Sequence, residues 1–192
     1  MKSLKRILCF ILFLTISLVN YSNAAEQSFE LTLVMPRDLY HRPKLIYLAP
    51  KRNRPSFHVL LRNISKNPQT LVGSTCSATG FPNKLFFKIT IDGKELKIVE
   101  NDPFECFGTF PVFWTIYPKE YFVFDIYFNN EEWTSDLPDL RMLASKTAKI
   151  KAIFRSSGDI YTFPADSIDD KYSKYNIWAG EVESNLEEVR FQ

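Results

Sequence analysis

Apolar and polar residues alternate one for one in several segments of this 192-residue chain, and this two-residue period strongly constrains its fold. Successive side chains of a β-strand point to opposite faces, so the alternation predicts strands with one buried face. No segment shows a long helical period, and the chain therefore predicts an all-β fold. The expected buried faces are Phe29, Leu31, Leu33; Phe57, Val59, Leu61; Phe87, Ile89, Ile91; Phe122, Phe124, Ile126, Phe128; and Ala148, Ile150, Ala152, Phe154.

Short connections separate these segments. Asp92-Gly93 predicts a tight hairpin turn, because both residues accept positive φ readily. Pro118 predicts a second turn after the aromatic run 110–116. Residues 131–143 break the alternation and have room for one short helical turn. About seven to nine strands without strand–helix alternation favour an antiparallel β-sandwich over a parallel α/β sheet.

The last predicted strand has Val182, Ser184 and Leu186 on one face, and Trp178 and Gly180 precede it. We expect Trp178 to cover the open end of the core and Gly180 to let the chain pass close to the indole. Large aromatic side chains are usually buried, which favours this interpretation over an exposed tryptophan in a ligand groove. The polar pair at 184–185 is expected to bond local backbone.

The N-terminus predicts export. Residues 1–24 combine a basic start, an apolar run at 7–19 and small residues at Ser22 and Ala24, the pattern of a secretory signal peptide. The run is shorter than the about 20 residues that a membrane-spanning helix needs. Cleavage would leave one soluble domain, residues 25–192, which we expect in the periplasm; the 45% apolar content supplies its core.

Charge and motifs disfavour several function classes. Three of the 24 basic residues lie in the signal, leaving 21 against 22 acidic ones, so a cationic nucleic-acid-binding protein is not indicated. The chain has no Gly-x-Ser-x-Gly elbow, and its six glycines form no phosphate loop. His41 and His58 are isolated, and the acidic run 165–170 lacks the glycine and glutamate of a calcium loop. We expect no catalytic residue, metal or cofactor; an enzyme of unrecognised type is a second alternative.

Two cysteines remain after the signal, since Cys9 is removed with it. An even pair in an exported chain predicts a disulfide between Cys76 and Cys106; two independent buried thiols are the alternative. Four phenylalanines crowd near this pair. They form either a partner-binding tip on a cross-linked rim or core packing beneath the disulfide, and the sequence leaves both open. These are Phe81, Phe104, Phe107 and Phe110.

A basic, proline-rich connection at 36–55 is the other candidate binding segment. It can dock an anionic surface such as lipid headgroups, an acidic polysaccharide or an acidic protein, or it can be a solvated loop. Its candidate anion-binding residues are Arg37, Arg42, Lys44, Lys51, Arg52 and Arg54.

Three short motifs resemble a known family. Trp-Ala-Gly-Glu-Val-Glu-Ser-Asn (178–185) is similar to the last strand of immunoglobulin-like domains in bacterial exported proteins, and the alternating strand 149–157 precedes it as in those domains. The turn and strand 117–126 and the strand end 61–65 are laid out as in the proteinase-inhibitor-like immunoglobulin fold. Lys119 departs from the pattern, since glycine usually follows the turn proline, and the cysteine pair is not general in such domains.

The resemblance covers residues 56–192 and implies an immunoglobulin-like β-sandwich that binds or caps a partner, with no catalytic residues. The expected function is a non-catalytic binding module for a protein of the cell envelope, as an inhibitor or immunity-type protein would be. The alternative is an adaptor that binds an anionic envelope component through residues 37–54.

Overall fold

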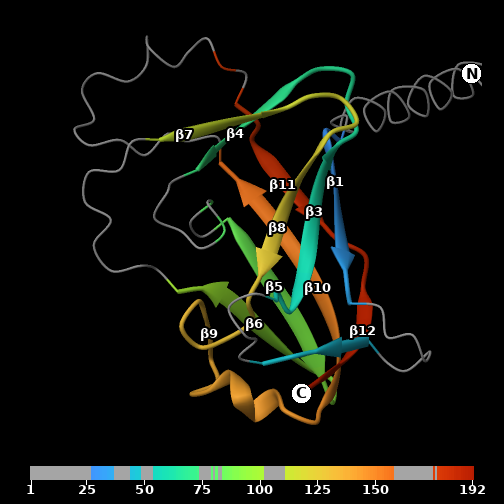
Figure 1. Ribbon diagram of the computed structural model, residues 1–192, viewed down its shortest axis with the longest axis vertical. Helices are drawn as coiled ribbons and strands as arrows, with labels where there is room; N and C mark the ends of the chain where they lie inside the picture. The colour runs from blue at the N-terminus through green and yellow to red at the C-terminus, as the bar shows by residue number, and fades with distance from the viewer. Residues whose placement is uncertain are drawn as a thin grey trace, which may run out of the picture.

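The computed structural model is all-β in the residues that it describes, with twelve strands and one short 3-10 helix, η1 (Leu140–Leu143) (Figure 1). The strands form three sheets. The described residues are 27–36, 44–48, 54–73, 79, 81, 84–101, 111–157, 175 and 177–192.

The three-stranded sheet has the order β1-β3-β8, and the seven-stranded sheet has the order β2-β12-β10-β5-β6-β9, with β11 also paired to β10. A separate ribbon consists of β4 and β7. All strand pairs are antiparallel except β2 with β12. The bounds are β1 Phe29–Val34, β2 Lys44–Ile46, β3 Phe57–Asn63, β4 Gln69–Gly73, β5 Leu85–Ile91, β6 Lys94–Glu100, β7 Val112–Ile116, β8 Tyr121–Ile126, β9 Trp133–Ser135, β10 Thr147–Ser156, β11 Gly180–Glu183 and β12 Glu187–Phe191.

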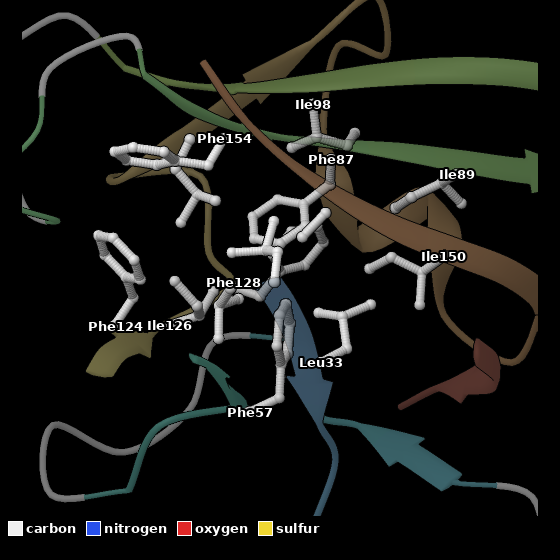
Figure 2. Close-up of a cluster of buried hydrophobic side chains, with 14 of the residues drawn as sticks. Leu33, Phe57, Phe87, Ile89, Ile98, Phe124, Ile126, Phe128, Ile150 and Phe154 are labelled. Atoms are coloured by element: carbon white, nitrogen blue, oxygen red, sulfur yellow. The ribbon is translucent and has the colours of Figure 1, made fainter. Parts of the chain in front are cut away.

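One hydrophobic core joins the two larger sheets. The predicted inward faces are confirmed, since their residues are buried, apart from Phe122, which is half-buried and packs against the same core. Figure 2 shows Leu33 and Phe57 of the three-stranded sheet pointing towards Phe87 and Ile150 of the seven-stranded sheet. The rings of Phe57 and Phe87 meet edge to face, with centroids 5.3 Å apart. Two sheets that share one core form an arrangement compatible with a β-sandwich.

The paired strands β3 and β8 are followed and preceded in the chain by β4 and β7, which form their own ribbon. The chain bends between the two pairs, and this corner turns the β4–β7 ribbon away from β3 and β8 (Figure 1). The fully buried side chain of Asn63 fastens this corner. Its Nδ2 donates to the carbonyl oxygens of Asn67 and Ile116, both at 2.8 Å. Its Oδ1 accepts from the N–H and the hydroxyl of Ser65, at 2.9 and 2.7 Å. The amide therefore satisfies both donors and both acceptor positions.

The predicted turns are present. Asp92 and Gly93 both have positive φ, at 50° and 77°, and join β5 to β6. The turn that follows Pro118 also forms, closed by the Glu120 N–H donating to the Tyr117 carbonyl at 3.0 Å. Lys119, in place of the usual glycine, has φ +73°. This turn does not join two paired strands, because β7 pairs with β4 whereas β8 pairs with β3.

A bulge divides the last predicted strand into β11 and β12. Both pair with β10, but Phe154 opposes Val182 whereas Ala148 opposes Val189, which leaves one extra residue between them. The extra residue moves the buried face from even to odd positions, so Val189 is buried and Leu186 is 55% exposed. The prediction that Leu186 shares the inward face of Val182 is therefore wrong. Such interruptions also raise the strand number above the predicted one.

Two polar side chains hold this bulge. Ser184 Oγ accepts the N–H of Ala152 on β10 at 2.9 Å, and Asn185 Oδ1 accepts the N–H of Leu33 on β1 at 2.8 Å. The sequence predicts bonds to local backbone for this pair, and one exists, from Ser184 Oγ to the Asn185 carbonyl. The other bonds reach two different strands, so the bulge links the two sheets.

Candidate functional site

Phe81, one of the four candidate partner-binding phenylalanines, is a core residue with no exposed surface. Its ring lies 4.7 to 5.6 Å, between centroids, from four other aromatic rings, which belong to Trp114, Phe122, Phe124 and Phe154. Of the two alternatives, a partner-binding tip or core packing, Phe81 therefore follows core packing. The rest of the proposed tip, Phe104, Phe107 and Phe110, and both cysteines, Cys76 and Cys106, lie outside the described residues.

Two of the six candidate anion-binding residues are described. Lys44 pairs with Glu187 of β12, so its charge is already engaged. Arg54 is exposed. Arg37, Arg42, Lys51 and Arg52 lie outside the described residues, and an anion site in this segment stays a prediction.

Trp178 is half-buried and packs on the core, as predicted. Its ring meets Phe29 edge to face at 5.1 Å and stacks on Phe154 at 6.0 Å, between centroids. A Cβ added at Gly180 would lie 2.8 Å from the Trp178 Cζ2 atom. Glycine at this position therefore gives the indole its space.

The most exposed apolar side chains of the three-stranded sheet lie on and beside its edge strand β8. β3 pairs with one edge of β8, and in the described part of the chain no strand pairs with the other. Tyr121 and Val123 point away from the core and are 61% and 43% exposed. Aromatic and β-branched residues on an open edge make a strand a template for pairing with another chain.

The backbone of β8 has a definite open side. The Asn63 N–H donates to the Glu120 carbonyl at 2.9 Å, which sets the phase of the ladder. Antiparallel residue pairs alternate between hydrogen-bonded and non-bonded pairs. The register therefore directs the amides of Phe122 and Phe124 to β3 and leaves those of Tyr121 and Val123 on the open edge.

Few features guard this edge. Proteins usually protect open edges with lysine, proline or bulges, and the six residues of β8 contain neither lysine nor proline. The acidic residue of β8, Asp125, lies 2.8 Å from His58 Nδ1 on the neighbouring strand. Its charge is thus directed to its own sheet rather than outward along the edge.

The outer face of the same sheet continues the exposed apolar surface. Across its three strands, the cross-strand register places Thr32, Leu60 and Val123 in one row. The next row combines Tyr121 with the ion pair of Arg62 and Glu30, whose charged atoms are 3.9 Å apart. The sheet thus has an apolar centre and a charged border, as a docking surface for a protein would.

The sequence located β8 as a strand but not as an edge. Tyr121 and Val123 belong to a run that the alternation assigns correctly, with Phe122, Phe124 and Ile126 inward. Whether a strand has one neighbour or two depends on pairing between distant segments, and β8 lacks the lysine or proline that would mark it locally as an edge.

Among the described residues, no group of three His, Cys, Asp or Glu side chains is arranged to hold a metal ion. Within the same residues, no helix has the length and apolar character to cross a membrane.

No family model, curated protein or solved structure matches this chain.

Proposed function

We propose that this chain is an exported, non-catalytic binding module of immunoglobulin-like topology, which recognises a protein partner by strand pairing along β8. The strand order supports the topology. Six strands taken in chain order, β1, β3, β5, β8, β10 and β12, correspond to strands A, B, C, E, F and G of that fold. The β1-β3-β8 layer then corresponds to A-B-E, and the β12-β10-β5 series corresponds to G-F-C.

The open edge of β8 is the observation that carries the binding role. An extended peptide that adds a strand to a sheet edge gains main-chain hydrogen bonds, and side chains on the neighbouring face give it specificity. Tyr121 and Val123 supply such side chains, and their exposure leaves them free to be covered. Burying them would contribute about 25 cal/mol per Å² of apolar surface.

The proposed location is the cell envelope, because residues 1–24 have the pattern of an export signal. A partner there needs an unpaired strand or an extended loop of its own. An inhibitor or immunity-type protein acts in this way when it covers an exposed segment of an envelope enzyme.

Photo-crosslinking in the envelope fraction tests this proposal. A benzophenone side chain at position 121 should capture one defined protein, whereas the same group at Thr90, on the outer face of the seven-stranded sheet, should not. Val123→Pro removes an N–H on the open edge without removing a bond to β3, and proline is tolerated on edge strands. This variant should fold and lose the crosslink.

Val123→Thr is the matched control, because it keeps the amide and the β-branched shape and should retain the crosslink. Persistence of the product in a folded Val123→Pro variant would refute strand pairing. The same product from position 90 would refute the choice of edge.

A further inference from the structure

Three lysines stand directly opposite one another on the outer face of the seven-stranded sheet. The register pairs Lys88 of β5 with Lys97 of β6 on one side and with Lys151 of β10 on the other. Directly opposite residues have Cβ atoms about 4.5–5.5 Å apart, and like charges at this separation are destabilising. The sheet therefore carries an electrostatic cost that packing of the core does not require.

Only part of this positive charge is compensated. Glu183 of β11 accepts a hydrogen bond from Lys151 at 2.7 Å, and this bond lowers the pKa of the Glu183 carboxyl. Glu95 lies 3.6 Å from Lys88. The Lys97 ammonium lies instead over the Phe86 ring, 4.7 Å from its centroid.

Acidic residues on this face lie on β11 and beside the β5–β6 turn, and Glu188 of β12 lies directly opposite Lys149. Lys149 shares this face, because it is two residues before Lys151 on the same strand. Within the described residues, no carboxylate lies within ion-pair distance of Lys97 or Lys149. Because Lys149 has Glu188 directly opposite it, Lys97 is the lysine of the two that is more available to an external anion.

The face around the row has no exposed aromatic ring among the described residues. Phe86 and Ile153 face outward but are only 7% and 1% exposed, and Lys97 and Arg155 lie over the Phe86 ring. The large hydrophobic residues that are exposed lie elsewhere, on the three-stranded sheet, in η1 and in loops. This face therefore lacks the stacking platform that single-stranded nucleic acids use and the apolar residues that insert into a bilayer.

We propose that the row Lys97–Lys88–Lys151, with Lys149 beside it, binds a linear acidic polysaccharide. Neighbouring strands are about 4.8 Å apart, so the row presents ammonium groups at a repeat comparable to the length of one sugar unit. A polymer with one carboxylate per sugar that lies across the strands places its charges over successive lysines. The site is separate from the β8 edge, so the two interactions are independent.

Binding of the full mature chain to polygalacturonate, measured by calorimetry at low and at physiological salt, tests this site. Lys88→Gln with Lys97→Gln should weaken binding about 3- to 30-fold, the effect of losing two exposed ion pairs. Lys66→Gln with Lys119→Gln removes the same charge at a distance from the row and should leave the affinity within about twofold, because salt screens distant charges. Wild-type binding should weaken with added salt.

Each other outcome overturns the proposal. Equal weakening in both double variants would mean that only net charge matters. Absence of binding by the wild-type chain would exclude the ligand class. Tighter binding to phosphatidylglycerol vesicles or to single-stranded DNA than to polygalacturonate would assign the row to a different polyanion. Thermal unfolding of both variants must match the wild-type chain, which separates loss of binding from loss of fold.

Discussion

Asn63→Ala should be among the most destabilising single substitutions of a polar residue in this chain. The side chain is fully buried and makes four hydrogen bonds at the corner between β3–β4 and β7–β8. Alanine leaves the carbonyl of Ile116 buried without this partner, at a cost of about 1–3 kcal/mol. The three partly exposed bonds contribute about 0.5–1 kcal/mol each.

Together these terms predict a loss of about 2.5–6 kcal/mol, a large fraction of the 5–15 kcal/mol that stabilises a typical domain. Urea unfolding at equilibrium measures it, and the slope of free energy against urea should be unchanged, because the fold persists. The melting temperature should fall by about 10 °C, since 1 kcal/mol corresponds to about 2–4 °C in a domain of this size.

Two further variants test the reasoning. Asn63→Asp keeps the shape and the bonds from Ser65 but turns a carboxylate oxygen towards two carbonyl oxygens, so it should destabilise at least as much as alanine. Ser65→Ala removes a partner at the exposed side of the corner and should cost only about 1 kcal/mol. An Asn63→Ala variant within 1 kcal/mol of wild type, or an Asn63→Asp variant as stable as wild type, would refute the corner's proposed role.

Three other substitutions have defined outcomes. Gly180→Ala should cost about 1–3 kcal/mol in chemical unfolding, because its Cβ meets the Trp178 indole at 2.8 Å, and Trp178→Ala should remove that penalty. Lys119→Gly should stabilise the fold by up to about 1 kcal/mol in thermal melts, because glycine removes the strain of the positive φ and this gain exceeds the entropic cost of ordering a more flexible residue. A lower melting temperature would contradict this. Glu183 has a lowered pKa, so its pairing with Lys151 stabilises the fold above the unfolded carboxyl pKa and is lost as pH falls through the lower folded value. Glu183→Gln should therefore reduce the loss of stability measured as pH falls below about 4.5, and an unchanged acid profile would exclude this contribution.

The inward faces of the strands could be predicted because the two-residue period is a property of the backbone itself. The same rule fails at Leu186, where one extra residue shifts the phase. The bulge depends on Ser184 and Asn185, which bond to β10 and β1. The sequence identifies these residues as polar and short but does not identify the strands that they reach.

The two candidate surfaces differ in how much of each was predictable. The two-residue turn at Asp92-Gly93 fixes the register of its hairpin, so the opposition of Lys88 and Lys97 follows from local sequence. Lys151 joins them only through pairing of β5 with β10, some 60 residues apart, which requires the assembled sheet. The open edge of β8 likewise follows from which strands pair and not from its own residues.

Phe81 shows a further limit of prediction from the sequence pattern. Its neighbours in the sequence show no alternation, so the pattern gave no preference between a core residue and a surface tip. In the structure, aromatic rings from three strands surround it, on β7, β8 and β10. Its burial depends on these non-local contacts, which no local period reports.

Amide hydrogen exchange in β8, followed by NMR on the isolated chain without residues 1–24, most directly tests the claim that this strand is an open edge. The amides of Phe122 and Phe124 should be protected by their bonds to β3, and those of Tyr121 and Val123 should exchange rapidly. Protection of all four amides would show that another strand already occupies the edge and would contradict the proposed mode of binding.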